Sequence, residues 1–287
     1  PPQDFIVHGL AIPADSHSQF VTDGGGLKSL MLLLVLGEMA KQGIPVALVD
    51  WEWNAARHLG RKRRLFGDAR LDSLYYLRCR NALTIEKDHI RRFCEQRAIR
   101  FIGLDSIGAA CDGKLADDDI ARAYNRALDD LPPSISAAHV PKSTLDPSAD
   151  LKAFGSAFFH NYARMTWTHK KQVGASDDVV TILLVPHKQN DGTRRPPVGL
   201  EFTVAPDQIR VKNVAPESIE SFAQALPLQV RILHLLKRGP LTAEAITDEL
   251  GAKDDSVRRA LKRSGAVTKV LGIDGMTKFA LIERRPL

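Results

Sequence analysis

The feature that most constrains this chain is a glycine-rich segment followed by a lysine, a serine and an apolar run. Residues 21–29 read Val-Thr-Asp-Gly-Gly-Gly-Leu-Lys-Ser, an apolar stretch with helical character follows at 30–39, and an apolar stretch typical of a strand comes at 44–49. Glycines let the backbone turn tightly enough for its N–H groups to face phosphate oxygens, and a helix N-terminus adds a favourable dipole. This order predicts a phosphate-binding loop.

Such a loop would bind ATP together with Mg²⁺. Lys28 would reach the β- and γ-phosphates, and the Ser29 hydroxyl would coordinate the metal ion. The usual pattern has glycine where this chain has Thr22 and Leu27. A glycine-rich turn that caps a buried helix is therefore the alternative interpretation. The residues expected to bind the nucleotide are Gly24, Gly25, Gly26, Leu27, Lys28, Ser29 and Leu30.

Size and composition fit a globular protein with one large domain and one small one. The chain has 287 residues, of which 44% are hydrophobic. Its apolar runs are too short to cross a bilayer and its first residues lack the layout of a signal peptide, so we expect a cytoplasmic protein that is not attached to a membrane. The cysteines, Cys79, Cys94 and Cys111, form no CxxC pair, so neither a disulfide framework nor a zinc site is expected.

Residues 44 to about 210 alternate short apolar stretches with polar helical ones, which is typical of an α/β domain with a mostly parallel sheet. The pattern predicts strands at 45–49, 74–77, 100–104, 135–138 and 179–185, and helices at 85–96 and 118–130. Segments rich in proline, glycine and charge predict loops at 112–119, 144–152 and 189–197. A break near residues 225–227 predicts two domains, 1–225 and 226–287.

Basic residues are concentrated in the second domain. From residue 227 to the end there are twelve Lys and Arg residues against seven Asp and Glu, whereas the whole chain has a net charge of +6. A small basic domain suggests an anionic partner, and nucleic acid is the first candidate. A second basic cluster, at 57–64, is more often a solvated helix face than a binding site.

The second domain has the layout of a winged helix-turn-helix. Helices are expected at 228–236, 243–250 and 254–264, followed by a hairpin of residues 267–271 and 278–282 around Asp274-Gly275. The third helix would enter the major groove of duplex DNA. A protein-docking module is the alternative interpretation. The residues expected to contact DNA here are Arg258, Arg259, Lys262 and Arg263.

Two acidic residues follow predicted strands, as nucleotide hydrolysis requires. Asp105 ends the strand Phe-Ile-Gly-Leu-Asp, and Glu52 comes just after the strand that ends at Asp50. Carboxyl ends of parallel strands meet at one edge of a sheet, where the phosphate loop also lies. Asp105 would hold Mg²⁺ and Glu52 would polarise the attacking water. Taken singly, each acid could instead cap the helix that follows.

The motifs together resemble the RepA-type branch of the RecA-like ATPases, which includes hexameric replicative helicases of plasmids and phages. The resemblance rests on the Lys-Ser loop, Asp-Trp-Glu at 50–52, Leu-Asp-Ser at 104–106, Ala-His-Val-Pro-Lys-Ser at 138–143 and Phe-Gly-Ser-Ala-Phe-Phe-His-Asn-Tyr-Ala-Arg at 154–164. It implies that Glu52 is the catalytic base, Asp105 the Walker B aspartate and His139 a γ-phosphate sensor. The last segment resembles the loop that lines a central DNA channel, so Lys152, Ser156 and Arg164 are candidates for contacting single-stranded DNA.

A further segment, His187-Lys188-Gln189-Asn190-Asp191-Gly192, is similar to the one that reaches the neighbouring subunit's nucleotide in hexameric helicases. Lys188 fits this role, while Asn190 stands where an arginine finger is common. Arg194 or Arg195 could substitute. Because an arginine finger can be worth about 10³ to 10⁵ in rate, slow turnover is expected.

These observations predict a Mg-ATP-dependent, ring-forming ATPase, a homo-oligomer of hexameric type. Single-stranded DNA would occupy the ring channel and duplex DNA the winged helix. The expected role is that of a replicative helicase of a plasmid, phage or other mobile element. The alternatives are a nucleotide-gated DNA-binding regulator that does not unwind DNA, and a scaffold with an inactive nucleotide site.

Overall fold

The structure of the protein, a computed structural model, describes residues 4–22, 27–139, 155–173, 178–189, 195–218, 226–272 and 275–282. The chain divides into two units, Pro1–Val214 and Ala215–Leu287. Gly24, Gly25, Gly26, Lys152, Asn190 and Arg194 lie outside the described residues. In the part of the chain described, no helix is both long enough and apolar enough to span a membrane.

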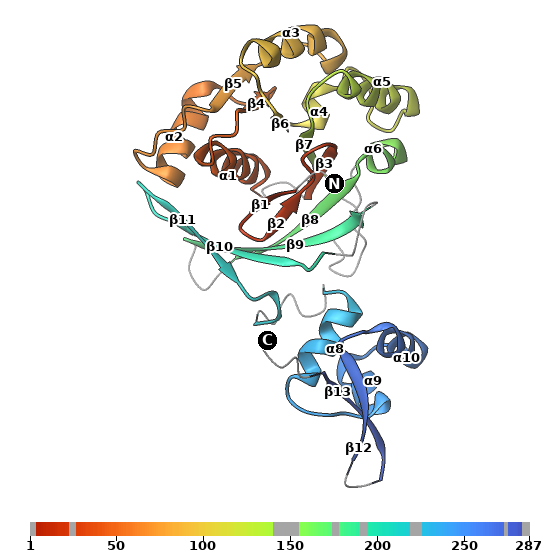
Figure 1. Ribbon diagram of the computed structural model, residues 1–287. Coiled ribbons are helices and arrows are strands. Elements are labelled where there is room, and N and C mark those ends of the chain that lie inside the picture. The colour runs from red at the N-terminus through yellow and green to blue at the C-terminus, as the bar shows by residue number, and fades with distance from the viewer. Residues whose placement is uncertain are drawn as a thin grey trace. The chain divides into compact units, whose positions relative to one another are not determined.

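A nine-stranded sheet in the order β11-β10-β9-β8-β3-β7-β6-β4-β5 organises the first unit (Figure 1). Its strands are β3 (His17–Thr22), β4 (Val46–Asp50), β5 (Leu74–Arg78), β6 (Phe101–Asp105), β7 (Ser134–His139), β8 (Met165–Val173), β9 (Val179–Gln189), β10 (Val198–Val204) and β11 (Ile209–Val214). Neighbours from β8 to β5 pair in parallel. Those from β8 to β11 pair in antiparallel fashion. The predicted mostly parallel α/β architecture is confirmed.

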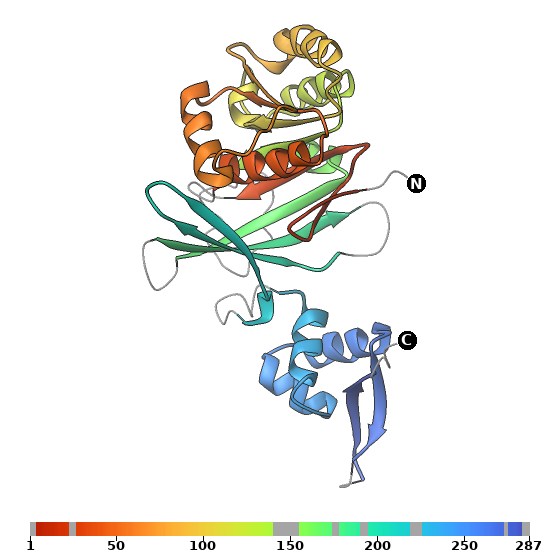
Figure 2. The same cartoon turned by 60° about the vertical axis from the view of Figure 1, so that its left-hand side comes forward.

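Helices cover both faces of the parallel strands. They are α1 (Lys28–Lys41), α2 (Ala55–Phe66), α3 (Leu83–Gln96), α4 (Ile107–Ala110), α5 (Asp118–Asp129) and α6 (Ala157–Tyr162). Because side chains alternate along a strand, Leu48 packs into the core that contains α1, whereas Ala47 and Val49 pack into the core that contains α3 and α5. Strands β9–β11 form the edge of the sheet opposite to β5, away from α3 and α5 (Figures 1 and 2).

The antiparallel strands are the part of the sheet that the sequence predicted least well. Among them, β9 was expected, but β8, β10 and β11 were not, and neither were β3 or the small hairpin of β1 (Phe5–Val7) and β2 (Leu10–Ile12). The β3 segment begins His-Ser-Gln, and these polar residues interrupt the apolar pattern of a buried strand. Its Gln19 side chain is nevertheless buried, because it donates a hydrogen bond of 2.8 Å to the backbone oxygen of Phe159.

The second unit contains three helices and a hairpin. They are α8 (Leu228–Leu236), α9 (Ala243–Leu250), α10 (Asp254–Arg263), β12 (Val267–Leu271) and β13 (Thr277–Leu281), preceded by the short 3₁₀ helix η1 (Pro216–Ser218). Ile232, Ile246 and Val257 bring the three helices together in one apolar core. The backbone of Leu241 pairs with Phe279 of the hairpin. The order of elements follows the sequence pattern, while their assignment to the winged-helix class stays a prediction.

The packing of α2 against α1 gives a test of the fold. Gly37 on α1 faces the ring of Phe66, and a Cβ atom at position 37 would overlap that ring. We expect Gly37→Ala to lower the free energy of unfolding by about 1 to 3 kcal/mol, because the ring has to move. Gly60→Ala on α2 is the matched control: no atom lies within 4 Å of its added Cβ, and the change should stabilise by up to about 1 kcal/mol. Urea denaturation of both variants checks this pair, and equal effects would contradict it.

Candidate nucleotide-binding site

The carboxyl ends of the central parallel strands bring the predicted catalytic residues to one edge of the sheet. The register of β3 and β7 pairs Thr22 with His139, and that of β4 and β6 pairs Asp50 with Asp105. Lys28 begins α1 after the loop that leaves β3. This edge of an open parallel sheet is where such folds bind ligands.

Lys28 lies at the N-terminus of α1 with its side chain largely buried. The residue before it, Leu27, has the left-handed backbone conformation with φ 58°, and Lys28 is 8% exposed. Its ammonium nitrogen lies 3.1 Å from Nδ1 of His139. Burial and the charge of Lys28 lower the pKa of His139, so its ring is neutral at pH 7 and Nδ1 accepts the hydrogen bond. The predicted loop lysine and the predicted phosphate sensor are therefore in direct contact.

Asp105 is a buried carboxylate whose charge is poorly compensated. It is 1% exposed, and neither of its oxygens has a partner with full hydrogen-bond geometry among the described residues. Burial raises its pKa to about 6, the nearby Ser29 hydroxyl counteracts this, and the charges of Glu52 and Asp50 add to the rise. A buried carboxylate without a partner, beside a serine hydroxyl, is the environment that a divalent cation would stabilise. These residues fit a Mg²⁺ ion.

Glu52 is exposed at the end of β4 and is held by its neighbours. Its carboxylate accepts a hydrogen bond from the hydroxyl of Ser106, and its backbone N–H donates to Oδ1 of Asp50 at 2.8 Å. Asp50 itself is fully buried. The Glu52 carboxylate is exposed, and its backbone is held by the buried Asp50, so it can activate a water molecule next to a bound phosphate.

Asp50 has the role that sequence reasoning missed. Its carboxylate accepts hydrogen bonds from the backbone N–H of Trp53 at 3.1 Å, from Nε2 of His58 at 3.2 Å and from the hydroxyl of Tyr76 at 3.0 Å. Burial alone would raise the pKa of Asp50, but these hydrogen bonds lower it below the usual value. Trp53 and His58 follow Asp50 closely in the turn and in α2, whereas Tyr76 comes from β5, and that pairing depends on the tertiary structure.

The basic cluster of α2 is not only a solvated surface. The guanidinium group of Arg57 stacks 3.5 Å from the ring centre of Trp53. Burial and the charge of Arg57 lower the pKa of Arg61, while the nearby carboxylates of Asp105 and Asp50 counteract this. Arg57 is exposed, as expected for a solvated helix face, whereas Arg61 is partly buried and differs from that expectation. Beside them, Glu52, Trp53 and the side chains of Arg78 and Arg80 line an open hollow of about 550 Å³.

Two of the residues predicted to act at the DNA channel or in a neighbouring subunit, Ser156 and Lys188, have partners within their own chain. Ser156 is 6% exposed, donates to Asp118 at 2.6 Å and accepts from the backbone N–H of Phe158, so it caps α6. The Lys188 ammonium donates to the backbone oxygens of His160 and Asn161 at the end of α6. Burial and the charge of Arg164, which is exposed, lower the pKa of Lys188. Roles in binding DNA or a neighbour's nucleotide stay predictions for all three.

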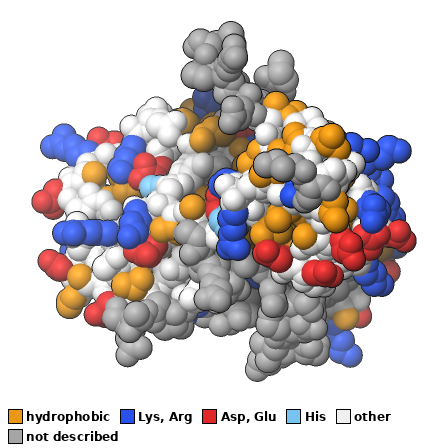
Figure 3. Space-filling model, turned by 90° about the horizontal axis from the view of Figure 1, so that it is seen from below, with side chains coloured by type: hydrophobic (Ala, Val, Ile, Leu, Met, Phe, Trp, Pro, Cys, Tyr) orange, Lys and Arg blue, Asp and Glu red, His pale blue; other side chains and the backbone are white. Residues whose placement is uncertain are grey.

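The four basic residues of α10 are exposed, but not all of them are equally available. Arg258 donates to Asp254 at 2.6 Å, whereas Arg259 donates to the backbone oxygen of Asp255. Lys262 and Arg263 end the helix. Figure 3 shows a face of the molecule on which Lys and Arg side chains lie beside acidic ones, not an unbroken basic surface.

Comparisons with known proteins show the fold. A KaiC-like protein from the hyperthermophilic archaeon Pyrococcus horikoshii OT3 matches with a TM-score of 0.55 and 15% identity, covering 74% of this chain and 99% of the other. The flagellar accessory protein FlaH from Methanocaldococcus jannaschii matches with a TM-score of 0.50 and 16% identity, covering 73% and 92%. No protein-family model and no curated protein matches the sequence. The first unit therefore has the fold of the RecA-like ATPases, and the RepA-type branch stays a prediction.

The two adjacent carboxylates give a prediction with opposite signs. The pKa of Asp105 is about 6 in the folded protein, above its ordinary value of 3.8. The free energy of unfolding therefore decreases as pH rises through this interval, because the folded state has to release a proton that it binds more tightly than the unfolded state does. Asp105→Asn should therefore stabilise the metal-free protein at pH 8, by about 2 to 3 kcal/mol, and have little effect at pH 4.

Asp50→Asn is the matched control for that experiment. Because the folded pKa of Asp50 is lowered, its ionised form contributes stability above pH 3.8 that is lost as pH falls. The variant should destabilise the protein at pH 8, and the loss should shrink in acid. Urea denaturation with EDTA at both pH values tests the pair of variants. If both Asp105→Asn and Asp50→Asn lower the free energy of unfolding at pH 8, the charge of Asp105 is compensated in the folded protein.

Proposed function

We propose that the protein is a Mg-ATP-dependent, ring-forming RecA-like ATPase that acts on DNA, as a replicative helicase of a plasmid, phage or other mobile element. The observation that carries the proposal is the convergence of Lys28, Glu52, Asp105 and His139 at one edge of the parallel sheet. A phosphate-binding lysine, a carboxylate for the metal ion and an exposed carboxylate for water are the parts that nucleotide hydrolysis requires.

Each residue has a distinct task in this mechanism. Lys28 would leave its hydrogen bond with His139 and bind the β- and γ-phosphates. Ser29 and Asp105 would hold Mg²⁺, which supplies charge neutralisation at the phosphates. Glu52, kept in place by Asp50 and Ser106, would orient the attacking water and accept its proton. When Lys28 moves to the phosphates, Nδ1 of His139 would lose its hydrogen bond with Lys28, and His139 would respond to the γ-phosphate in this way.

Substitutions at Lys28 and Glu52 should separate nucleotide binding from hydrolysis. Lys28→Ala should abolish productive ATP binding, because the phosphates lose a charge-assisted hydrogen bond. Glu52→Gln should keep ATP affinity within about twofold and lose turnover by roughly 10²-fold or more, because an amide accepts no proton. Calorimetric titration of Mg-ATP and steady-state hydrolysis are the measurements, with Glu95→Gln on the exposed side of α3 as the control. Unchanged hydrolysis in Glu52→Gln would remove Glu52 from this role.

A nucleotide-gated DNA-binding regulator is the second candidate, and the position of Lys188 favours it. The ammonium group of Lys188 is engaged by carbonyls at the end of α6, so reaching a neighbour's nucleotide would require breaking these hydrogen bonds. ATP turnover with and without single-stranded DNA, combined with the solution mass in the presence of ATP, distinguishes the two. A motor should assemble in the presence of ATP and hydrolyse ATP faster when single-stranded DNA is added. A regulator should assemble in the presence of ATP with no increase in its rate of hydrolysis on DNA.

The DNA part of the proposal rests on the second unit, whose α10 presents four exposed basic side chains. We expect Arg259 and Arg263 to contact phosphates of duplex DNA. Replacing both with Glu should weaken binding and reduce the slope of log affinity against log salt concentration by about 0.9 for each lost contact. Arg258, which pairs with Asp254, should contribute less.

Fluorescence anisotropy at several salt concentrations measures these slopes. ATP hydrolysis without DNA should persist in the Arg259→Glu and Arg263→Glu double variant, because both residues lie outside the first unit. If the salt slope stays at the wild-type value, α10 does not hold phosphates and the second unit is better explained as a protein-docking module.

A further inference from the structure

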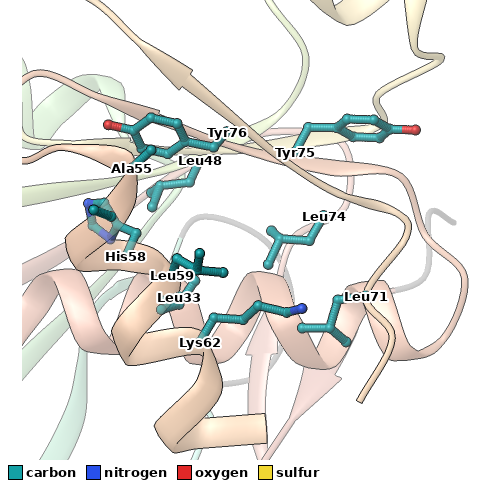
Figure 4. Close-up of a pocket in the computed structure, with 11 residues that line it drawn as sticks. Leu33, Leu48, Ala55, His58, Leu59, Lys62, Leu71, Leu74, Tyr75 and Tyr76 are labelled. Carbon is teal, nitrogen blue, oxygen red and sulfur yellow. The ribbon is translucent and has the colours of Figure 1, made fainter. Parts of the chain in front are cut away.

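A hollow of about 350 Å³ lies between α2 and the edge strand β5, on the sheet face that α1 covers (Figure 4). Its walls are mostly apolar and include Leu33 of α1, Leu48 of β4 and Leu74 of β5. Ala55 and Ala56 of α2 also line the hollow, and both are exposed. The volume of this hollow falls in the range of small-molecule sites.

Two polar side chains, those of Lys62 and His58, lie in the mostly apolar wall of this hollow. Lys62 lies along one side of the hollow, its extended chain directed toward Leu71 (Figure 4). Lys62 is partly buried and has no ion pair among the described residues. His58 is 4% exposed, and its Nδ1 atom is buried without a hydrogen-bond partner. Leu59, which is 45% exposed, marks the open side.

We propose that this hollow binds a small amphipathic anion, a carboxylate with an unbranched apolar chain. The leucine walls would take the chain out of water, at about 25 cal/mol for each Å² of apolar surface buried. The Lys62 ammonium complements one negative charge, and a long basic side chain can lie along an apolar surface while its charged end meets the carboxylate. A purely apolar ligand would leave this charge uncompensated.

The same hollow is connected to the proposed catalytic residue. Two side chains of its wall, His58 and Tyr76, donate hydrogen bonds to Oδ2 of Asp50. Asp50 in turn accepts from the backbone N–H of Glu52 at 2.8 Å. A ligand that packs against His58 and Tyr76 would fix the position of Asp50, and thereby of Glu52. Ligand binding would therefore change the rate of ATP hydrolysis, a consequence that rests on the proposed function.

Binding is tested first, on the full chain, by titrating octanoate in a calorimeter. We expect saturable binding, with octan-1-ol weaker because it lacks the charge. Lys62→Gln should lower the affinity for octanoate about fivefold, since a partly exposed ion pair is worth up to about 1 kcal/mol. The affinity for octan-1-ol should stay unchanged. Arg63→Gln, one residue along α2 and outside the hollow, should leave both affinities unchanged. Ala55→Leu, which fills the hollow, should abolish binding of both compounds.

The binding experiment can overturn the proposal in three ways. Failure of octanoate to bind the wild-type chain, or equal binding to wild type, Lys62→Gln and Ala55→Leu, would remove the site. A third contrary result is that octanoate dissociates a homo-oligomer and Lys62→Gln leaves this unaffected, because a second copy of the chain would then occupy the hollow. If Ala55→Leu does not fold, the comparison of Lys62→Gln with Arg63→Gln still decides the matter.

Coupling is tested by ATP hydrolysis at saturating octanoate. The rate should change by twofold or more in wild type and in Arg63→Gln. In Tyr76→Phe, which keeps the ring but loses one of the two hydrogen bonds from the wall to Asp50, octanoate should bind while the change in rate is smaller than in wild type. An unchanged rate in a wild-type protein that binds octanoate would overturn the coupling. Absence of ATP hydrolysis with octanoate binding intact would instead contradict the proposed function and leave the binding site standing.

Discussion

The parallel pairing of β4 with β6 is the constraint on which the candidate site depends, because its register places Asp50 beside Asp105. Two buried carboxylates side by side repel each other, and the protein resolves this by giving them different environments. Asp50 is surrounded by donors from the β4–α2 turn, α2 and β5, and its pKa is lowered. Asp105 is left without full partners, and its pKa is raised to about 6. Environments that separate two pKa values in this way are characteristic of functional sites.

Helix α2 connects this site to the rest of the unit. It is a strongly basic helix whose contacts with the body come from a few side chains, with His58 on Asp50, Arg57 on Trp53 and Phe66 over Gly37. Few apolar contacts leave the hollow beside β5 unfilled. One carboxylate thus links the backbone of the proposed catalytic glutamate to the wall of a cavity, and a change in either is transmitted through hydrogen bonds of about 3 Å.

The accuracy of the sequence-based expectations depended on how local their causes were. Strands such as β4 and β6 were found because fully buried parallel strands are continuous apolar runs, and their terminal acids could be placed at one edge of the sheet. Strand β3 was missed because its polar start is buried through contacts with other segments, as Gln19 shows. Strands β8, β10 and β11 pair in an antiparallel extension, which depends on contacts that no short window of sequence contains.

The sequence by itself determined the chemical parts of the candidate site: a lysine and a serine at a helix start, and acids after apolar strands, because these follow from residue type and order along the chain. Only the tertiary structure decided how the parts are used. It brings Lys28 to His139, leaves the charge of Asp105 poorly compensated, makes Asp50 an anchor for Glu52, stacks Arg57 on Trp53 and partly buries Arg61. Charge compensation and burial are properties of surroundings drawn from distant segments, so residue order alone cannot specify them.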